Sequence, residues 1–260
     1  MLAEINAGEG RRRRRDPAPR RLPDHAPEAP RGWYIRWKAK VEWVIALFLL
    51  VLTSPLIGVA AVLVKLTSRG PAFYCQTRLG KHGRPYTIYK IRTMFQDAES
   101  GTGPCWATRN DPRVTPIGRF LRRTHLDELP QLWNVLKGDM SLVGPRPERP
   151  EFVNQLAPLI PRYRDRLLVR PGVTGLAQVQ LPADTDLASV RRKLAHDLCY
   201  LQQVSLGLDL RIVLLTACDL FGIPYRMSRW LFRVPGGEAV ERAYERQVAA
   251  DEKRSQAQSA

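Results

Sequence analysis

The pattern of apolar and polar positions divides the chain into one long apolar run and several shorter amphipathic segments. The run from Trp43 to Val64 contains no charged residue and is long enough to cross a bilayer. Thr53-Ser54-Pro55 stands at its midpoint, where proline removes a backbone donor and clashes with the preceding turn. The run is therefore either a straight span with a proline kink or a helix that breaks at Ser54-Pro55 and turns back.

Basic residues flank this run on both sides. They are Arg31, Arg36, Lys38 and Lys40 before it, and Lys65, Arg69, Arg78, Lys81 and Arg84 after it. A helix that crosses a membrane usually leaves its basic residues on the cytoplasmic side alone. Balanced flanks therefore favour a helix whose two ends stay on the same side. Trp33, Tyr34 and Trp37 lie among the first group, a mixture typical of an anchor at the membrane interface.

A β-hairpin is predicted directly after this segment. Aromatic and β-branched residues are frequent in 73–79 and again in 84–92, and the four residues between them include Gly80 and Gly83. Alternation along the second strand places Lys90 and Arg92 on one face. Taken alone, these two cations are as consistent with a solvated strand face as with a binding site.

Three helices are predicted further along the chain. The first begins at Thr124, which with Asp127 resembles a capping box, and ends at Lys137-Gly138. The other two cover 186–204 and 208–221, where apolar residues recur at helical spacing. Either of these can be a core helix or can lie on a bilayer. Pro145-Arg146-Pro147 cannot form regular helix and is expected to be a fixed, extended loop.

Both ends of the chain differ in composition from the centre. Residues 1–32 contain a block of five arginines at 11–15 and closely spaced prolines, so a disordered tail is expected there. Such a tail either stays in solvent or tethers the chain to anionic headgroups. Residues 223–260 begin with a basic and aromatic segment at 227–234 and end in a polar frayed helix or tail. The expected organisation is therefore 1–32, a membrane helix at 33–67, a domain at 68–222, and 223–260.

The charge of the chain indicates an acidic partner. The 260 residues include 41 lysines and arginines against 25 acidic residues, a net charge of +16. Nucleic acid, anionic lipid and a phosphorylated substrate all satisfy this charge, but the apolar run favours lipid and no nucleic-acid-binding motif is present. The four cysteines are scattered, which argues against structural zinc and a disulfide framework and favours reduced thiols in a cytoplasmic domain.

The densest group of chemically active residues lies between Arg119 and Glu148. Within it, Asp127 and Glu128 are adjacent carboxylates surrounded by cations. Acidic residues in the first turn of a helix are common, because they interact favourably with the helix dipole. The alternative is a catalytic pair, in which one carboxylate attacks phosphorus or binds a metal while the other positions or deprotonates.

Three segments carry a resemblance to a known family. They read YKIRTM at 89–94, RRTHLDELPQLWNVLKGDMSLVGPRPE at 122–148 and RPGVTG at 170–175. These segments closely resemble the bacterial sugar transferases known as monotopic phosphoglycosyl transferases, in their small form, and the resemblance covers about residues 33–222. One departure stands after Gln178, where the family's usual Asn-Gly-Arg reads Gln180-Leu181-Pro182.

The resemblance implies an activity and a site. The enzymes of this family transfer a sugar 1-phosphate from a UDP-sugar to a polyprenyl phosphate and release UMP. By this resemblance, Asp127 is the nucleophile that forms a covalent phosphosugar intermediate, and Glu128 binds Mg²⁺ or handles the proton. Magnesium is the implied cofactor, with Asp127 and Glu128 as its ligands. The expected phosphate- and nucleotide-binding residues are Lys90, Arg92, Arg122, Pro145, Arg146 and Pro147.

The resemblance also implies a fold and a location. It predicts an α+β monotopic membrane protein: a helix that re-enters at Ser54-Pro55, a β-hairpin, and several amphipathic or interfacial helices around one compact domain. That domain would lie on the cytoplasmic face of the bacterial inner membrane, with membrane lipids and downstream glycosyltransferases as partners. The alternative is a non-catalytic, basic scaffold tethered to the membrane. A scaffold explains the charge and the apolar run, but it does not explain the 124–148 block.

Overall fold

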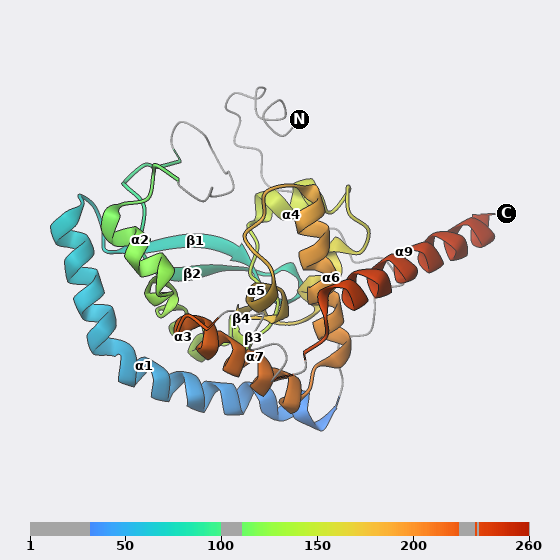
Figure 1. Cartoon of the computed structure of the whole chain (residues 1–260), viewed down its shortest axis with the longest axis horizontal. Coiled ribbons are helices and arrows are strands. Elements are labelled where there is room, and N and C mark those ends of the chain that lie inside the picture. The colour runs from blue at the N-terminus through green and yellow to red at the C-terminus, as the bar shows by residue number, and fades with distance from the viewer. Residues whose placement is uncertain (1–31, 100–110, 224–231, 233, 260) are drawn as a thin grey trace.

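The computed structural model describes residues 32–99, 111–223, 232 and 234–259. Helices surround two small sheets, and one long helix follows the edge of the molecule (Figure 1). This mixture of helix and sheet confirms the predicted combination of elements. The expected N-terminal tail lies outside the described residues up to residue 31, and most of the basic and aromatic segment at 227–234 lies outside them as well.

Helix α1 (Trp33–Thr67) contains Pro55 and continues through it without interruption. Figure 1 shows that the helix bends in its middle, so its two arms follow two edges of the molecule. Because Pro55 has no amide proton, the carbonyl of Val51 lacks its usual helical donor. The hydroxyl of Ser54 donates to that carbonyl at 2.8 Å. The predicted break therefore takes the form of a bend within one continuous helix.

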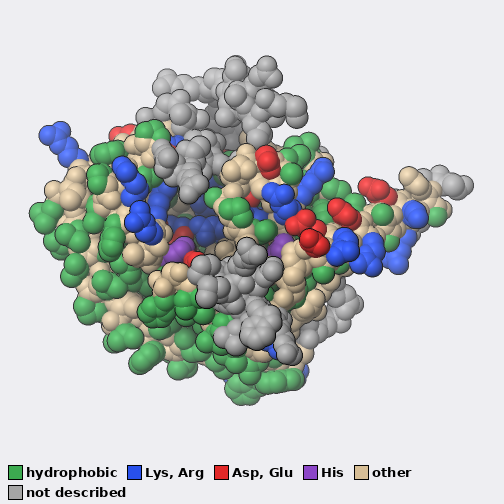
Figure 2. Space-filling model, in the orientation of Figure 1, with side chains coloured by type: hydrophobic (Ala, Val, Ile, Leu, Met, Phe, Trp, Pro, Cys, Tyr) green, Lys and Arg blue, Asp and Glu red, His purple; other side chains and the backbone are tan. Residues whose placement is uncertain are grey.

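Both arms of α1 pack on the same domain. In the first arm, Ala46 is buried against residues of the hairpin and of the 131–140 region. In the second arm, Ala60 and Val64 are buried against Ile91 and Leu121. The opposite side of the helix is apolar and exposed, and Figure 2 shows hydrophobic side chains along the edge that α1 follows. Among the described residues, α1 is the one helix whose length and composition suit a membrane span.

The predicted hairpin is confirmed. Strand β1 (Phe73–Leu79) pairs antiparallel with β2 (Pro85–Ile91), and a short 3₁₀ turn, η2 (Lys81–Gly83), joins them. Lys90 lies opposite Tyr74 in the register of this pair.

The helix predicted from Thr124 is divided into two pieces, and a further helix precedes them. Helix α2 (Pro116–Arg123) ends at Thr124, whose hydroxyl donates back to the carbonyl of Phe120. A 3₁₀ turn, η3 (Leu126–Glu128), follows, and α3 (Gln131–Lys137) begins after Pro130. The predicted capping box is therefore wrong, because Thr124 closes the preceding helix and His125 adopts a left-handed conformation (φ 54°). The predicted end is confirmed, since Gly138 caps α3 at φ 79°.

A second, parallel strand pair follows, which the pattern of residues did not predict. Strand β3 (Ser141–Val143) pairs with β4 (Gly172–Thr174), and α4 (Pro150–Leu156) and the 3₁₀ helix η4 (Tyr163–Leu168) lie between them in sequence. The pairing requires close backbone approach, because a Cβ atom on Gly172 would lie 2.1 Å from the amide nitrogen of Gly144.

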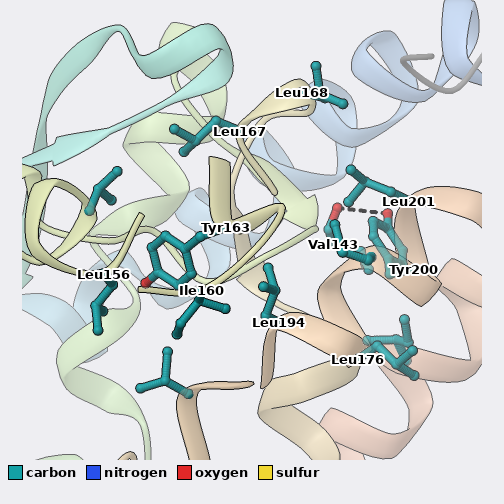
Figure 3. Packing of buried hydrophobic residues seen from close by; sticks show 14 of the residues in the cluster. Val143, Leu156, Ile160, Tyr163, Leu167, Leu168, Leu176, Leu194, Tyr200 and Leu201 are labelled. Carbon is teal, nitrogen blue, oxygen red and sulfur yellow. Dashed lines mark hydrogen bonds between the residues drawn. The ribbon is translucent and has the colours of Figure 1, made fainter. Parts of the chain in front are cut away.

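The remaining helices complete the core. They are α5 (Leu176–Gln180), α6 (Leu187–Gln203), α7 (Leu206–Leu220) and α9 (Gly237–Ser259). Helices α6 and α7 confirm the two amphipathic segments. The polar C-terminal segment forms α9, which packs its N-terminal part on α6 and does not remain a tail. The largest core cluster gathers side chains from β3, α4, η4 and α5 to α7, and Tyr200 donates to the carbonyl of Val143 within it (Figure 3).

Candidate active site

The acidic pair lies in a short turn that packs against α1. Asp127 and Glu128 belong to η3, and the preceding Leu126 packs into the cluster formed with Ala60 and Val64 of α1. The side chain of Asp127 is buried, with 7% of the residue exposed. We call the segment from His125 to Glu128 the catalytic turn, after the role that the family resemblance implies for Asp127. Its position is fixed by the second arm of α1 and by strand β2.

Glu128 is held by two cations from distant parts of the chain. Its Oε1 atom lies 2.7 Å from Lys90 Nζ and 3.0 Å from Arg146 Nη2. Burial alone would raise the pKa of Glu128, but the charges of Arg146 and Lys90 outweigh burial and hold that pKa far below its usual range. Glu128 is therefore ionised at neutral pH.

Asp127 differs from Glu128 in its hydrogen bonds and in its pKa. Within the described residues, no side chain or backbone amide donates to its carboxylate. Burial, together with the charge of Glu128, raises the pKa of Asp127 to about 6 against the lowering effect of Lys90, Arg122 and Arg146. The site thus combines one carboxylate that is paired with two cations and one that is buried and accepts no hydrogen bond from the described residues.

Arg122 approaches the same region from the end of α2. Its Nε atom donates to the hydroxyl of Thr93 at 2.8 Å, and its charge acts on Asp127. Together with Lys90 and Arg146, it gives the acidic pair three cationic neighbours. Figure 2 shows lysine and arginine side chains gathered in a hollow on this face of the molecule. Such a group of cations suits a ligand with several phosphate charges.

The loop that carries Arg146 is extended and fixed, as predicted. Each of its three carbonyl oxygens accepts a hydrogen bond from another part of the chain. The donors are Gly172 N to Pro145 O at 2.8 Å, Arg166 Nη2 to Arg146 O at 3.1 Å, and Arg78 Nη1 to Pro147 O at 3.1 Å. The loop is therefore clamped in the conformation that aims Arg146 at Glu128, whereas Pro145 and Pro147 act here through their backbone.

Arg166 is a site-supporting residue that sequence reasoning missed. It is almost fully buried, and its Nη2 atom lies 2.7 Å from Asp197 Oδ2. It also donates to Glu148 and to Tyr163. Nothing in the local pattern distinguishes it from the other arginines near it, because its partners come from separate elements.

The structure does not bring Arg92 to the acidic pair. Its guanidinium donates to the carbonyl and hydroxyl oxygens of Ser68, at 2.9 and 2.8 Å, and to the carbonyl of Arg69. Arg92 follows strand β2 directly, its amide donates to the carbonyl of Ala72, and its side chain caps the end of α1. Its buried Nε atom has no partner among the described residues, and the expected phosphate-binding role stays a prediction.

A buried charged network joins the first arm of α1 to the domain. Glu42 accepts from Ser141 Oγ at 2.6 Å and from Val143 N at 3.2 Å. Lys38 Nζ lies 2.7 Å from Glu42 Oε1 and 2.5 Å from Asp209 Oδ2 at the start of α7. Outside this buried network, at the other end of α7, the exposed Asp219 has its Oδ2 atom 3.5 Å from Nε2 of His125, which is also exposed, in the catalytic turn. No local pattern in the sequence predicts these pairings.

No group of three or more metal-binding side chains occurs in the described parts of the chain. Magnesium in phosphoryl-transfer sites is often held by only one or two carboxylates together with substrate phosphates. The free carboxylate of Asp127 beside Glu128 fits this smaller donor set.

Comparison with known proteins gives a consistent picture. Residues 33–222 match the family model described as bacterial sugar transferase. The UDP-N-acetylgalactosamine-undecaprenyl-phosphate N-acetylgalactosaminephosphotransferase of Aeromonas hydrophila is 44% identical over 187 residues, which is 72% of this chain and 44% of that protein. The UDP-glucose:undecaprenyl-phosphate glucose-1-phosphate transferase of Caulobacter vibrioides is 46% identical over 185 residues, 70% of this chain and 69% of that protein.

The share of each relative that the match covers varies. A putative undecaprenyl-phosphate N-acetylgalactosaminyl 1-phosphate transferase of Bacillus subtilis is 50% identical over 134 residues, 52% of this chain and 74% of that protein. The match covers less than half of two relatives. It covers 44% of the Aeromonas hydrophila protein and 40% of a UDP-glucose:undecaprenyl-phosphate glucose-1-phosphate transferase of Xanthomonas campestris.

Proposed function

The chain belongs to the family of bacterial sugar transferases, and on that basis we propose that it transfers a sugar 1-phosphate from a UDP-sugar to undecaprenyl phosphate and releases UMP. One observation carries the proposal: the buried carboxylate of Asp127 has no hydrogen-bond donor among the described residues, whereas Glu128 beside it is bound by two cations. A desolvated, unbonded carboxylate is suited to nucleophilic attack.

In the first step, an oxygen of Asp127 attacks the phosphorus atom that carries the sugar. A bond forms between that oxygen and phosphorus, and the bond to the bridging oxygen of the diphosphate breaks. The bridging oxygen leaves with the electron pair as part of UMP. Lys90, Arg122 and Arg146 lie where they can neutralise the phosphate charge as it shifts to the leaving group. The product is a covalent aspartyl phosphosugar.

In the second step, a phosphate oxygen of undecaprenyl phosphate attacks the same phosphorus atom. The bond to Asp127 breaks, the carboxylate returns to its initial state, and the lipid diphosphate sugar leaves. The soluble donor and the lipid acceptor thus use one site in turn, which gives ping-pong kinetics. The product is a lipid-linked sugar, so an enzyme that extends such lipids at the membrane must consume it.

Magnesium is the cofactor we propose for this site. Asp127 and Glu128 would hold it together with the diphosphate, and it would supply additional charge neutralisation when bound. Glu128 also keeps Lys90 and Arg146 beside Asp127. Arg146 and the backbone of Pro145 and Pro147 form the side of the site nearest the hairpin, and we assign the nucleotide to that side.

We further propose that α1 enters one leaflet of the inner membrane and returns, with the domain on the cytoplasmic face. Two observations support this. Both arms of α1 pack against one domain, and a single domain cannot lie on both sides of a bilayer. Glu42 and Lys38 of the first arm are bound to β3 and α7, so that arm is attached to the domain by charged groups as well as by packing.

The decisive experiment measures UMP release by the purified full-length chain with undecaprenyl phosphate and a panel of UDP-sugars. We expect release with at least one donor and, without acceptor, one equivalent of sugar phosphate bound to protein. Asp127→Asn should abolish both signals. Arg123→Gln, an exposed change in the same region, is the matched control and should retain both.

Two results would overturn the proposal. One is a wild-type protein that releases no UMP with any donor, as a non-catalytic scaffold would behave. The other is an Asp127→Asn variant that releases as much UMP as wild type. The panel also identifies the sugar, since the named relatives differ in theirs.

The membrane placement has a separate test. Single cysteines at Arg36 and Arg69, in a chain whose four native cysteines are replaced by serine, are exposed to a membrane-impermeant thiol reagent. We expect both to react from the cytoplasmic side only. Reaction of residue 36 from the opposite side would show that α1 crosses the membrane.

A further inference from the structure

Helix α7 has apolar residues on two opposite faces. One face, which includes Leu208, Ile212 and Leu215, is buried in the core. The other face is exposed and apolar. It consists of Leu206, Leu210, Val213, Leu214 and Leu220, together with Phe221 directly after the helix, and we call it the outer row of α7. A surface helix of a soluble domain normally presents polar residues on its outer face, so this row needs an apolar partner.

The two ends of α7 are attached to two functionally different places. Near its start, Asp209 is bound by Lys38 and Tyr34, which lie in the aromatic and basic segment expected to anchor α1 at the membrane interface. Near its end, Asp219 lies 3.5 Å from His125, two residues before Asp127. A helix of 15 residues spans about 22 Å. Helix α7, which carries the outer row, therefore runs from the interface anchor to the catalytic turn.

We propose that the outer row of α7 binds the isoprenoid chain of the polyprenyl phosphate acceptor while its phosphate is at Asp127. The proposal rests on the proposed function, because it assumes that acceptor. An amphiphilic acceptor must place its phosphate at the buried carboxylate and its hydrocarbon in an apolar environment that leads back to the membrane. The outer row contains no charged side chain, and Asp209, Arg211 and Asp219 lie off it.

The exposure of the outer row supports a ligand that extends along α7 to the active site. Phe221, which follows Asp219 by two residues, is 85% exposed. General contact with the bilayer would require an apolar row but would not require the helix that carries it to end at the catalytic turn. We therefore assign the part of the isoprenoid chain next to the phosphate to Phe221, and a more distant part of that chain to Leu210.

Acceptors with isoprenoid chains of different length test these two assignments. The KM of the full-length protein is measured in detergent micelles of fixed composition for undecaprenyl phosphate and for the short geranyl phosphate. Leu210→Ser should raise the KM for undecaprenyl phosphate about tenfold and leave that for geranyl phosphate within twofold. Phe221→Ser should raise both. Leu159→Ser, an equally exposed leucine between α4 and η4, should change neither.

The acceptor-independent half of the reaction separates the two proposals. Each variant should form the covalent intermediate and release its first equivalent of UMP as wild type does. A wild type that forms no intermediate would reject the proposed function. Variants with a normal first step and unchanged KM values, or a Leu210→Ser variant that raises both KM values equally, would reject the role of the outer row. The latter result would make α7 a bilayer anchor only.

Discussion

Lys90 of strand β2 and Glu128 of the catalytic turn form an ion pair, with 2.7 Å between Nζ and Oε1. The pair joins the hairpin to the turn, and both side chains are largely shielded from water. Arg146 shares the same carboxylate oxygen. The charge of Glu128 is thereby balanced from two sides, and this balance limits how far its negative charge raises the pKa of Asp127.

Removing one partner of this pair should destabilise the protein. Lys90→Met leaves Glu128 with Arg146 alone and should lower the free energy of unfolding by about 2 kcal/mol, because a charge-assisted hydrogen bond is lost. The double variant Lys90→Met/Glu128→Gln should recover part of that loss, since no uncompensated carboxylate remains. Urea unfolding in micelles measures both. Additive losses in the double variant would show that the two residues do not interact.

The first catalytic step should depend on pH through Asp127. Burial raises the pKa of this carboxyl to about 6, and only the ionised form can attack phosphorus. Single-turnover formation of the covalent intermediate should therefore increase from pH 5 to 7 and level off above it. Lys90→Met should move the midpoint to higher pH, because the charge of Lys90 lowers the pKa of Asp127. A rate that is flat from pH 5 to 8 would contradict the assignment.

The carboxyl of Asp127 should lower the free energy of unfolding at neutral pH. In the unfolded chain its pKa is near 3.8, against about 6 in the folded protein, so the folded state holds a proton that the unfolded state has released. Stability from this group therefore decreases as pH rises from about 4 to about 6, by on the order of 3 kcal/mol. Asp127→Asn should be more stable than wild type at pH 8 and nearly equal to it at pH 4. Thermal unfolding at the two pH values measures the difference, and a variant less stable at pH 8 would refute it.

Arg166 should act on catalysis through Arg146. Its Nη2 atom donates to the carbonyl of Arg146, so Arg166→Lys should loosen the loop. A displaced Arg146 lowers the pKa of Asp127 less, and the pH midpoint of the first step should increase, with a rate about tenfold lower.

A matched control lies four residues earlier. Arg162 pairs with Asp165 at 2.9 Å and has no described contact with the Arg146 loop. Arg162→Lys should leave the pH midpoint unchanged. An Arg166→Lys variant that loses stability but keeps the wild-type midpoint would limit Arg166 to a structural role.

The bend of α1 should depend on Pro55. Pro55→Ala restores the amide donor to the carbonyl of Val51 and allows a straighter helix, so one arm should separate from the domain. Reaction of a cysteine at residue 36 with an impermeant reagent reports the change. Ser54→Ala keeps the proline and should preserve the bend, although it removes the 2.8 Å hydrogen bond to Val51 at a cost of about 1 kcal/mol. Identical labelling in wild type and Pro55→Ala would contradict a role for the proline.

Local signals in the sequence predicted local structure well. The hairpin, the glycine end of α3 and the two amphipathic helices α6 and α7 follow from turn residues and from spacing along the chain. The hydrogen bond from Ser54 to the carbonyl that Pro55 leaves without a donor is likewise local, because these residues lie in one turn. Thr124 shows the limit of local signals. A threonine at this position can begin the following helix or end the preceding one, and the structure has it ending α2, where Leu121 and Leu126 pack on α1.

Pairings between distant segments were not predictable in this way. The parallel strands β3 and β4 are only three residues each, too short to show a period. Arg92 stands one residue beyond the strand, and its partners at Ser68 and Arg69 come from the end of α1. Arg166 and Glu42 owe their roles to partners in other elements.

The sequence by itself determined the family, the apolar helix with its proline, and the adjacent carboxylates Asp127 and Glu128. Only the tertiary structure decided which of the two carboxylates is bound and which is free. Glu128 is paired with Lys90, 38 positions away in sequence, and with Arg146, 18 positions away. The difference arises because burial and the placement of cations set the charge and reactivity of a carboxylate, and both depend on how distant segments pack.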